Sequence, residues 1–141
     1  MTSYNVLVVD DEKEIQDAIE IYLSQEHMRV FKAGDGLEAL ELLERETVHL
    51  VILDVMMPRM DGITTAFKIR EAGSIPILML SAKSEDTDKI LGLQVGADDY
   101  VTKPFNPLEL VARVKSQLRR YTLLGNYKQT EHADRLRIRG L

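Results

Sequence analysis

Carboxylate residues follow the two most apolar segments of the chain. Asp10 and Asp11 come directly after the apolar run 6–9, and Asp54 follows the apolar run 49–53. Near-continuous apolar runs of this length are typical of strands that are buried on both faces of a parallel sheet. Since ligands of such sheets bind beyond the carboxyl ends of the strands, these carboxylates are expected to converge at one edge.

Convergence of three carboxylates has a chemical consequence. Like charges at short distance raise one another's pKa unless a cation lies between them. A hard cation with oxygen ligands meets this need, and Mg²⁺ suits a site that has few carboxylates and several retained waters. Asp10, Asp11 and Asp54 therefore predict a Mg²⁺ site.

A hydroxyl and an ammonium are expected at the same edge. Ser81 follows the apolar run 75–80, and Lys103 comes after the short run 100–101. The lysine can neutralise a developing anion as a point charge. This combination suits phosphoryl transfer to a carboxylate, in which the protein mainly positions the groups and neutralises the phosphoryl oxygens. Asp54 ends a fully apolar strand, so it is the best candidate nucleophile, and it would form an acyl phosphate.

Each of these residues also has a simpler interpretation. Asp10, Asp11 and Glu12 precede a segment of helical period and could cap it or compensate its dipole. Asp54 could cap a turn, and Ser81 could cap a following helix. The occurrence of five chemically suited residues at four strand ends favours one shared site.

Apolar runs and segments of helical period alternate along the chain. This pattern predicts five rounds of strand and helix, hence an α/β fold with a doubly wound parallel sheet and helices on both faces. The expected strands are 6–9, 28–33, 49–53, 75–80 and 100–101, and the expected helices are 12–25, 37–43, 63–72, 85–95 and 107–121.

The composition fits one domain with a short appendage. The chain has 141 residues, a formal net charge of −5 and no cysteine, which excludes disulfides and thiolate chemistry. Neither a signal peptide nor an apolar stretch long enough to span a bilayer is present, so we expect a cytoplasmic protein without a membrane partner. Residues 1–121 are expected to form the domain, 122–134 a linker, and 135–141 the first strand of a further domain.

The motifs at the strand ends resemble those of the response regulator receiver domain of two-component systems. The match covers roughly residues 4–121 and fills every functional position of that family. It implies the flavodoxin-like, CheY-like fold with strand order 2-1-3-4-5. The matching segments are Val8-Val9-Asp10-Asp11-Glu12, Leu53-Asp54-Val55-Met56-Met57-Pro58 with Asp61-Gly62, Leu80-Ser81-Ala82-Lys83, Gly96-Ala97-Asp98-Asp99-Tyr100 and Lys103-Pro104-Phe105.

The resemblance implies a ligand set for the metal and an acceptor for the phosphoryl group. Asp54 would accept the phosphoryl group and bind Mg²⁺ together with Asp11 and the backbone carbonyl of Met56. Asp10 would act through a metal-bound water. Lys103 would contact a phosphoryl oxygen, and its bond to the following proline is expected to be cis.

The resemblance also implies a switch. Ser81, where the family often has threonine, would move to hydrogen-bond the phosphoryl group, and Tyr100 would rotate inward in response. The phosphoryl donor would be a sensor histidine kinase. Such a module catalyses only its own phosphorylation and dephosphorylation and is not a turnover enzyme.

Within the family, the segments 106–110 and 112–120 resemble the OmpR subfamily, closest to its VanR-like branch. That subfamily forms homodimers through the fourth helix, the fifth strand and the fifth helix. It controls transcription through a C-terminal winged-helix DNA-binding domain, which would be missing here beyond its first strand. The intermolecular ion pairs implied by the resemblance are Lys89 with Glu109, Asp99 with Arg113, and Asp98 with Arg120.

Three other functions fit the sequence less well. A phosphatase of the haloacid dehalogenase type needs an aspartate two residues after its nucleophile, but Glu12 follows Asp10 at that spacing and Met56 follows Asp54. A flavin- or nucleotide-binding module needs a phosphate-binding loop after the first strand, and here that loop is acidic. A pseudo-receiver that serves only as an interaction surface usually lacks part of the acidic and lysine set.

Overall fold

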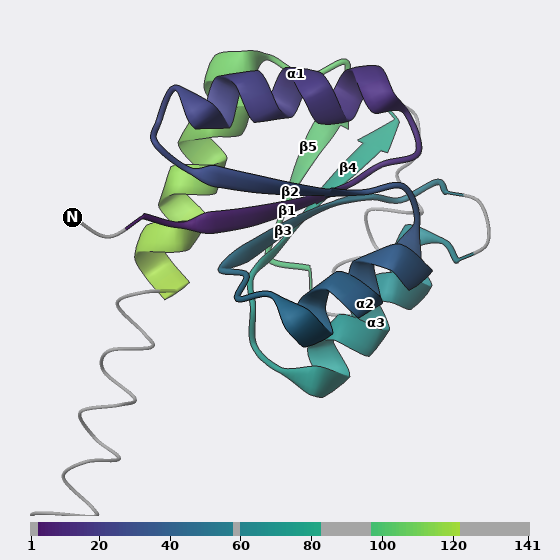
Figure 1. The fold of residues 1–141 in the computed structure, drawn as a ribbon. Coiled ribbons are helices and arrows are strands. Elements are labelled where there is room, and N and C mark those ends of the chain that lie inside the picture. Colours follow the sequence, from purple (N-terminus) through teal and green to yellow (C-terminus); the bar gives the residue numbers. More distant parts are fainter. Residues whose placement is uncertain (1–2, 58–59, 83–96, 122–141) are drawn as a thin grey trace, which may run out of the picture.

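A parallel sheet forms the centre of the computed structural model, which describes residues 3–57, 60–82 and 97–121 (Figure 1). All four pairs of neighbouring strands are parallel, and the strand order is β2-β1-β3-β4-β5. This confirms the predicted doubly wound sheet and the order implied by the resemblance. The strands are β1 (Asn5–Val9), β2 (Arg29–Ala33), β3 (Leu50–Asp54), β4 (Ile77–Ala82) and β5 (Asp99–Lys103).

Helices cover both faces of the sheet. One face carries α1 (Lys13–Ser24) and a C-terminal helix at residues 107–121, and the other carries α2 (Gly36–Arg45) and α3 (Gly62–Ala72) (Figure 1). The helix predicted at 85–95 lies outside the described residues.

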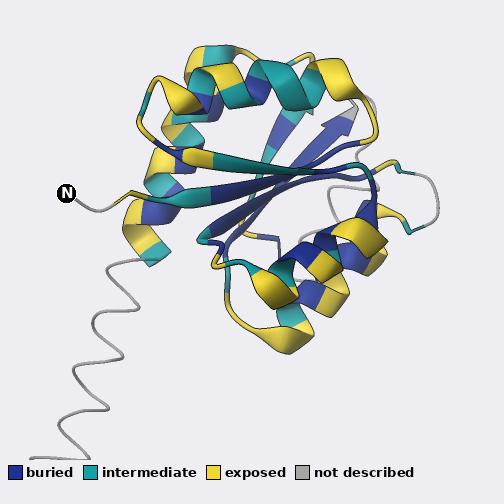
Figure 2. Cartoon of the chain, in the orientation of Figure 1, coloured by how far each residue is buried: buried dark blue, intermediate teal, exposed yellow. Residues whose placement is uncertain are grey.

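The strands supply two hydrophobic cores, one on each face. In β1, Leu7 and Val9 pack against the core under α2 and α3, whereas Val6 and Val8 pack against the core under α1 and the C-terminal helix. All five residues of β3 are buried, as Figure 2 shows for the central strands. Burial of each large apolar side chain contributes roughly 1.5–3 kcal/mol, so the central strands have little freedom to shift. Their carboxyl ends are correspondingly fixed.

All five strands differ from their predicted bounds by one or two residues, and the differences in β3, β4 and β5 place site residues inside the ladder. β4 begins at Ile77 because Pro76 precedes it and cannot donate a ladder hydrogen bond. At its other end β4 extends to Ala82 and so includes Ser81, which pairs in register with Thr102 of β5. β5 extends to Lys103, although its polar residues hide the strand pattern in the sequence.

Aspartates begin two of the helices. Asp35 Oδ1 accepts a hydrogen bond from the backbone N–H of Glu38 at 2.9 Å, and Asp61 Oδ1 accepts one from Thr64 at 2.7 Å. Each bond satisfies one of the free amides of a first helical turn. These caps start α2 and α3 directly after the loops at the carboxyl edge of the sheet.

Gly62 lies where α3 approaches the acidic end of β3. A Cβ atom at this position would lie 2.1 Å from the backbone oxygen of Asp54 and 2.7 Å from Cα of Val55. We expect Gly62→Ala to lower the free energy of unfolding by about 1–3 kcal/mol, because backbone atoms must shift to make room. Urea denaturation measures the change. Gly73→Ala at the other end of α3 is the control, since its Cβ would meet nothing within 4 Å; equal losses in both variants would contradict the steric explanation.

Candidate functional site

Three aspartates meet at the carboxyl edge of the sheet. Asp10, Asp11 and Asp54 each offer one carboxylate oxygen, and these oxygens all lie within 4.8 Å of one another. The neighbouring strands β1 and β3 bring them together, since Val9 of β1 pairs in register with Leu53 of β3. Asp10 is 0% and Asp54 is 5% exposed, whereas Asp11 is exposed. The site is thus a buried pair of carboxylates with a third at its opening.

Lys103 reaches this cluster from the far side of β4. Its Nζ lies 2.8 Å from Asp10 Oδ2, 3.3 Å from Asp54 Oδ2 and 3.6 Å from Glu12 Oε2. Burial alone would lower the pKa of Lys103, but the hydrogen bond to Asp10 and the charges of Asp10 and Asp54 outweigh it and raise the pKa. The side chain is therefore a permanent cation between the two buried carboxylates. The Lys103–Pro104 bond is cis, as the resemblance implied.

One ammonium does not fully compensate the buried carboxylates. Burial, followed by the negative charge of Asp10, raises the pKa of Asp54 to about 6. Burial also raises the pKa of Asp10, despite its contact with Lys103. Because the exposed carboxylate of Asp11 lies beside them, a divalent cation with oxygen ligands would relieve this repulsion. The donor set therefore fits Mg²⁺.

The hydrogen bonds of Asp10, Glu12 and Asp54 test whether these residues cap a helix or a turn. Glu12 precedes α1 but makes no side-chain capping bond. Asp10 Oδ1 accepts a bond from the backbone N–H of Glu12 at 2.9 Å, which fixes the carboxylate in the loop before the helix. Asp54 Oδ1 accepts a longer bond of 3.3 Å from Met56, so this aspartate does brace the turn after β3. Asp10 Oδ2 pairs with Lys103 and makes no further hydrogen bond to a residue that the structure describes.

Ser81 is buried at the same edge. The residue is 1% exposed, and its buried Oγ has no hydrogen-bond partner within residues 3–57, 60–82 and 97–121. Ser81 lies between the other two site residues in the sheet. Leu80, the residue before it, pairs with Asp54 of β3, and Ser81 itself pairs with Thr102 of β5, the residue before Lys103. A buried hydroxyl without a hydrogen bond lowers the stability of the folded protein, so this position is suited to donate to a ligand with acceptor oxygens. The helix that Ser81 could cap lies outside the described residues.

Three of the residues predicted for a dimer interface form ion pairs with one another within the chain. Arg113 Nη1 donates to both carboxylate oxygens of Asp99, at 2.7 and 2.9 Å, and Arg113 Nη2 lies 3.3 Å from Glu109. Hydrogen bonds to these carboxylates, those to Asp99 first, raise the pKa of Arg113. Asp99 and Arg113 therefore pair within one chain, and the intermolecular pair between them stays a prediction.

Asp98 has other partners than the predicted Arg120. Asp98 Oδ2 accepts hydrogen bonds from Arg70 at 2.9 Å and from the backbone N–H of Ile77 at 2.8 Å. Arg120 lines the same small hollow as Asp98 but has no ion pair with it among the described residues. Lys89 lies outside the described residues. Tyr100 is partly buried and packs against the core under α2 and α3.

Two residues near the site were not assigned to it from the sequence. Glu12 has no assigned site role in the sequence analysis, yet it lies near Lys103. Gln16 is not singled out there, yet its side-chain amide donates to the backbone carbonyl of Asp10. The position of Gln16 one helical turn after Glu12 is the only sequence signal for this contact, and many exposed helical residues share it.

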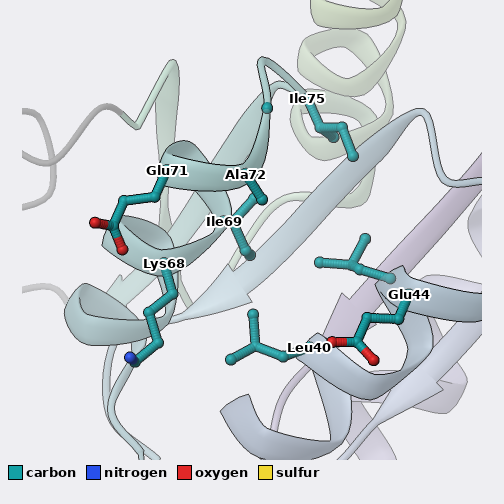
Figure 3. A pocket seen from close by; sticks show the side chains of 9 residues that line it. Leu40, Glu44, Lys68, Ile69, Glu71, Ala72 and Ile75 are labelled. Carbon is teal, nitrogen blue, oxygen red and sulfur yellow. The ribbon is translucent and has the colours of Figure 1, made fainter.

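A separate hollow of about 450 Å³ lies between α2 and α3 (Figure 3). Leu40 of α2 and Ile69 of α3 face each other across it, and Glu44, Lys68 and Glu71 stand at its rim. It is formed by the last turns of both helices and the loop before β4, so it lies away from the acidic cluster. No described contact shows what would cover it.

Comparisons with known proteins agree with the geometry. Residues 6–115 match the family described as "Response regulator receiver domain". The chain is 50% identical over 127 residues to the regulatory protein VanR of Enterococcus faecium, covering 90% of this chain and 55% of VanR. It is 55% identical over 119 residues to VanRc of Enterococcus gallinarum, covering 84% and 52%. The chain therefore spans about half the length of these curated relatives.

Solved structures show the same fold. The receiver domain of the Francisella response regulator 1452 has a TM-score of 0.78 and 37% identity, covering 83% of this chain and 98% of that one. The BeF3-activated DrrB receiver domain has a TM-score of 0.77 and 38% identity, covering 84% and 99%. In the part of the chain that the structure describes, no helix is long and apolar enough to cross a membrane. With this fold, this acidic cluster and these relatives, the chain belongs to the response regulator receiver family, is similar to the OmpR-family regulators of the VanR type, and is a regulatory domain and not a turnover enzyme.

Proposed function

We propose that the chain receives a phosphoryl group on Asp54 from a sensor histidine kinase. The observation that carries this proposal is the placement of Asp54: its carboxylate is 3.3 Å from Lys103 Nζ and lies within the cluster formed with Asp10 and Asp11. A carboxylate fixed beside a cation is suited to attack an electrophile whose charge must be neutralised.

In the proposed reaction, a carboxylate oxygen of Asp54 attacks phosphorus as the bond to the donor's histidine nitrogen breaks. The leaving imidazole retains the bonding electrons, and Asp54 becomes an acyl phosphate. Lys103 would exchange its contact with Asp54 for one with a phosphoryl oxygen. Asp11, Asp54 and the carbonyl of Met56 would hold Mg²⁺, with Asp10 acting through a water, and the metal when bound would neutralise phosphoryl oxygens.

Ser81 and Tyr100 are proposed to report the phosphoryl group. The buried Oγ of Ser81 has no partner in the described part of the chain, so it can donate a hydrogen bond to a phosphoryl oxygen without breaking any bond that this part makes. Movement of Ser81 toward Asp54 would open space on its other side, and Tyr100 would rotate into it. The end of β4 and the strand β5 would thus have two arrangements, one without and one with the phosphoryl group.

The proposed output is a homodimer through the fourth helix, β5 and the C-terminal helix. Asp99, Glu109 and Arg113 already form a charged network on this surface, which could exchange partners between two chains. Exposed ion pairs add little affinity each, so they would set the orientation of the dimer more than its strength. Lys89, Asp98 and Arg120 would complete the interface.

The longer relatives support a domain arrangement in which this receiver controls transcription. Residues 1–121 would form the receiver, 122–134 a linker, and 135–141 the first strand of a C-terminal winged-helix domain. DNA would be bound only through that domain, and we propose that the protein works in the cytoplasm.

Intact-mass spectrometry tests the phosphoryl acceptor. After incubation with acetyl phosphate and Mg²⁺, we expect one phosphoryl group per chain, because Asp54 is the one proposed acceptor and its carboxylate lies 3.3 Å from Lys103 Nζ. Chelation of Mg²⁺ should prevent the adduct, and Asp54→Ala should abolish it. Asp61→Ala, which removes an exposed helix-capping aspartate, is the matched control and should be phosphorylated normally. If the folded wild type gains no phosphoryl group, the domain is a pseudo-receiver and the proposed function is wrong.

A further inference from the structure

The side-chain amide of Gln16 connects α1 to the acidic edge of the sheet. Its Nε2 donates to the backbone carbonyl of Asp10 at 2.6 Å and to that of Ala33 at 3.1 Å. Both neighbours are acceptors, so the nitrogen end of the amide must face them, and its two hydrogens are both used. Ala33 also accepts a bond from the backbone N–H of Asp10 at 3.1 Å. The three groups form a closed hydrogen-bonded corner at the ends of β1 and β2.

Asp10 needs such support because it lies beyond the ladder. The last paired residue of β1 is Val9, which lies opposite Ala33 on one side and Leu53 on the other. Asp10 therefore has a buried backbone carbonyl one residue past the paired strands, where a missing donor would be costly. Gln16 supplies that donor from the second turn of α1.

The corner also determines where the acidic side chains point. Asp10 Oδ1 is held by the N–H of Glu12, and Asp10 Oδ2 is drawn toward Lys103 at 2.8 Å. Repulsion between the carboxylates would push the loop after β1 away from Asp54. The bonds from Gln16 would oppose that movement by holding the backbone of Asp10. The exposed Asp11 follows directly, so its position depends on the same backbone.

We infer that Gln16 is a positioning residue of the metal site: it holds the backbone of Asp10 and Asp11 so that their carboxylates stand ready for Mg²⁺. This inference rests on the proposed function, because it concerns the metal that assists phosphoryl transfer. Groups that orient metal ligands commonly change metal affinity by one to two orders of magnitude when they are removed. The described contacts of the Gln16 amide are to backbone carbonyls and to neither a carboxylate oxygen of the site nor Lys103, so Gln16 acts on the placement of these groups.

The test compares Gln16→Met with Ile19→Val. Methionine keeps the length and the unbranched shape of glutamine but has no donor for the two carbonyls. Ile19 lies one turn further along α1, fully buried in the core, and its truncation loosens the helix packing without touching the acidic edge. Mg²⁺ binding to each folded protein is measured by isothermal titration calorimetry, and folding is checked by circular dichroism.

We expect the dissociation constant for Mg²⁺ to rise about tenfold in Gln16→Met and to stay unchanged in Ile19→Val. In phosphorylation by acetyl phosphate, the half-saturating Mg²⁺ concentration should rise by a similar factor, while the rate at saturating Mg²⁺ should stay within about twofold of the wild type. This split separates positioning of the metal ligands from a general loss of structure.

Unchanged Mg²⁺ affinity in Gln16→Met would overturn the inference, as would equal weakening in Ile19→Val. In either case the wild type still binds Mg²⁺ and accepts the phosphoryl group, so the proposed function stands. A wild type that binds no Mg²⁺ would overturn the metal assignment of the proposed function, and this inference with it.

Discussion

Lys103→Met is expected to slow phosphorylation of Asp54 by about a hundredfold or more. Lys103 is the one cation that the described residues place in contact with both buried carboxylates, its Nζ lying 2.8 Å from Asp10 and 3.3 Å from Asp54. In the proposed reaction it neutralises charge that develops on the phosphoryl oxygens, and loss of one such contact typically costs a factor of about 10²–10³ in rate. Methionine keeps much of the side-chain volume, so the loss measures the charge and not the packing. The rate is followed by intact mass at saturating Mg²⁺ and a fixed concentration of acetyl phosphate.

Lys32→Met provides a matched control for this prediction. Lys32 also bridges two carboxylates, Asp17 and Glu20, but on the surface between α1 and β2. Hydrogen bonds to these carboxylates raise the pKa of Lys32, so both lysines are cations in similar pairings. Its removal should change the rate by less than about twofold, because exposed pairs contribute little and this one lies away from Asp54. A rate for Lys103→Met within tenfold of the wild type would show that Lys103 is not the main source of charge neutralisation.

The sheet and the residues at its edge were predictable because two independent patterns coincide. The continuous apolar runs of β1 and β3 require burial on both faces, and parallel strands place all their carboxyl ends together. Asp10, Asp11 and Asp54 follow directly from this placement. The strand order was implied by the resemblance, since apolar runs alone do not say which strands are neighbours.

Other features depend on side-chain geometry that the sequence does not encode locally. Asp98 pairs with Arg70 from α3, a residue distant in sequence whose approach depends on how α3 packs. The extent of β5 was underestimated because an edge strand tolerates the polar residues Asp99, Thr102 and Lys103. The contact of Gln16 with Asp10 was not predicted, since a glutamine in a helix is usually solvated and only the loop geometry brings a carbonyl within its reach.

Asp54→Asn is expected to stabilise the metal-free protein at neutral pH, although it removes the proposed acceptor. Burial, followed by the charge of Asp10, raises the pKa of Asp54 from 3.8 to about 6, so the folded state binds a proton more tightly than the unfolded state does. Stability is therefore lost as the pH rises from about 4 to about 6 and stays low above that range. At about 1.4 kcal/mol per pKa unit, the ionised carboxylate costs the folded state about 3 kcal/mol.

We expect a gain of roughly 1–3 kcal/mol for Asp54→Asn at pH 7.5, because the loss of one partner of Lys103 offsets part of the relief. Urea denaturation at pH 4 and pH 7.5 measures it, and the gain should nearly vanish at pH 4, where Asp54 is mostly protonated in the folded wild type. Saturating Mg²⁺ should reduce the difference at pH 7.5, since a cation bound to the folded wild type stabilises it by mass action.

Asp61→Asn keeps a capping oxygen on an exposed residue and serves as the control for an aspartate-to-asparagine change. If Asp54→Asn were less stable than the wild type at pH 7.5 without metal, the ionised carboxylate would be stabilising the fold. The carboxylates of the acidic edge would then not repel one another enough to favour the binding of a cation and a phosphoryl group.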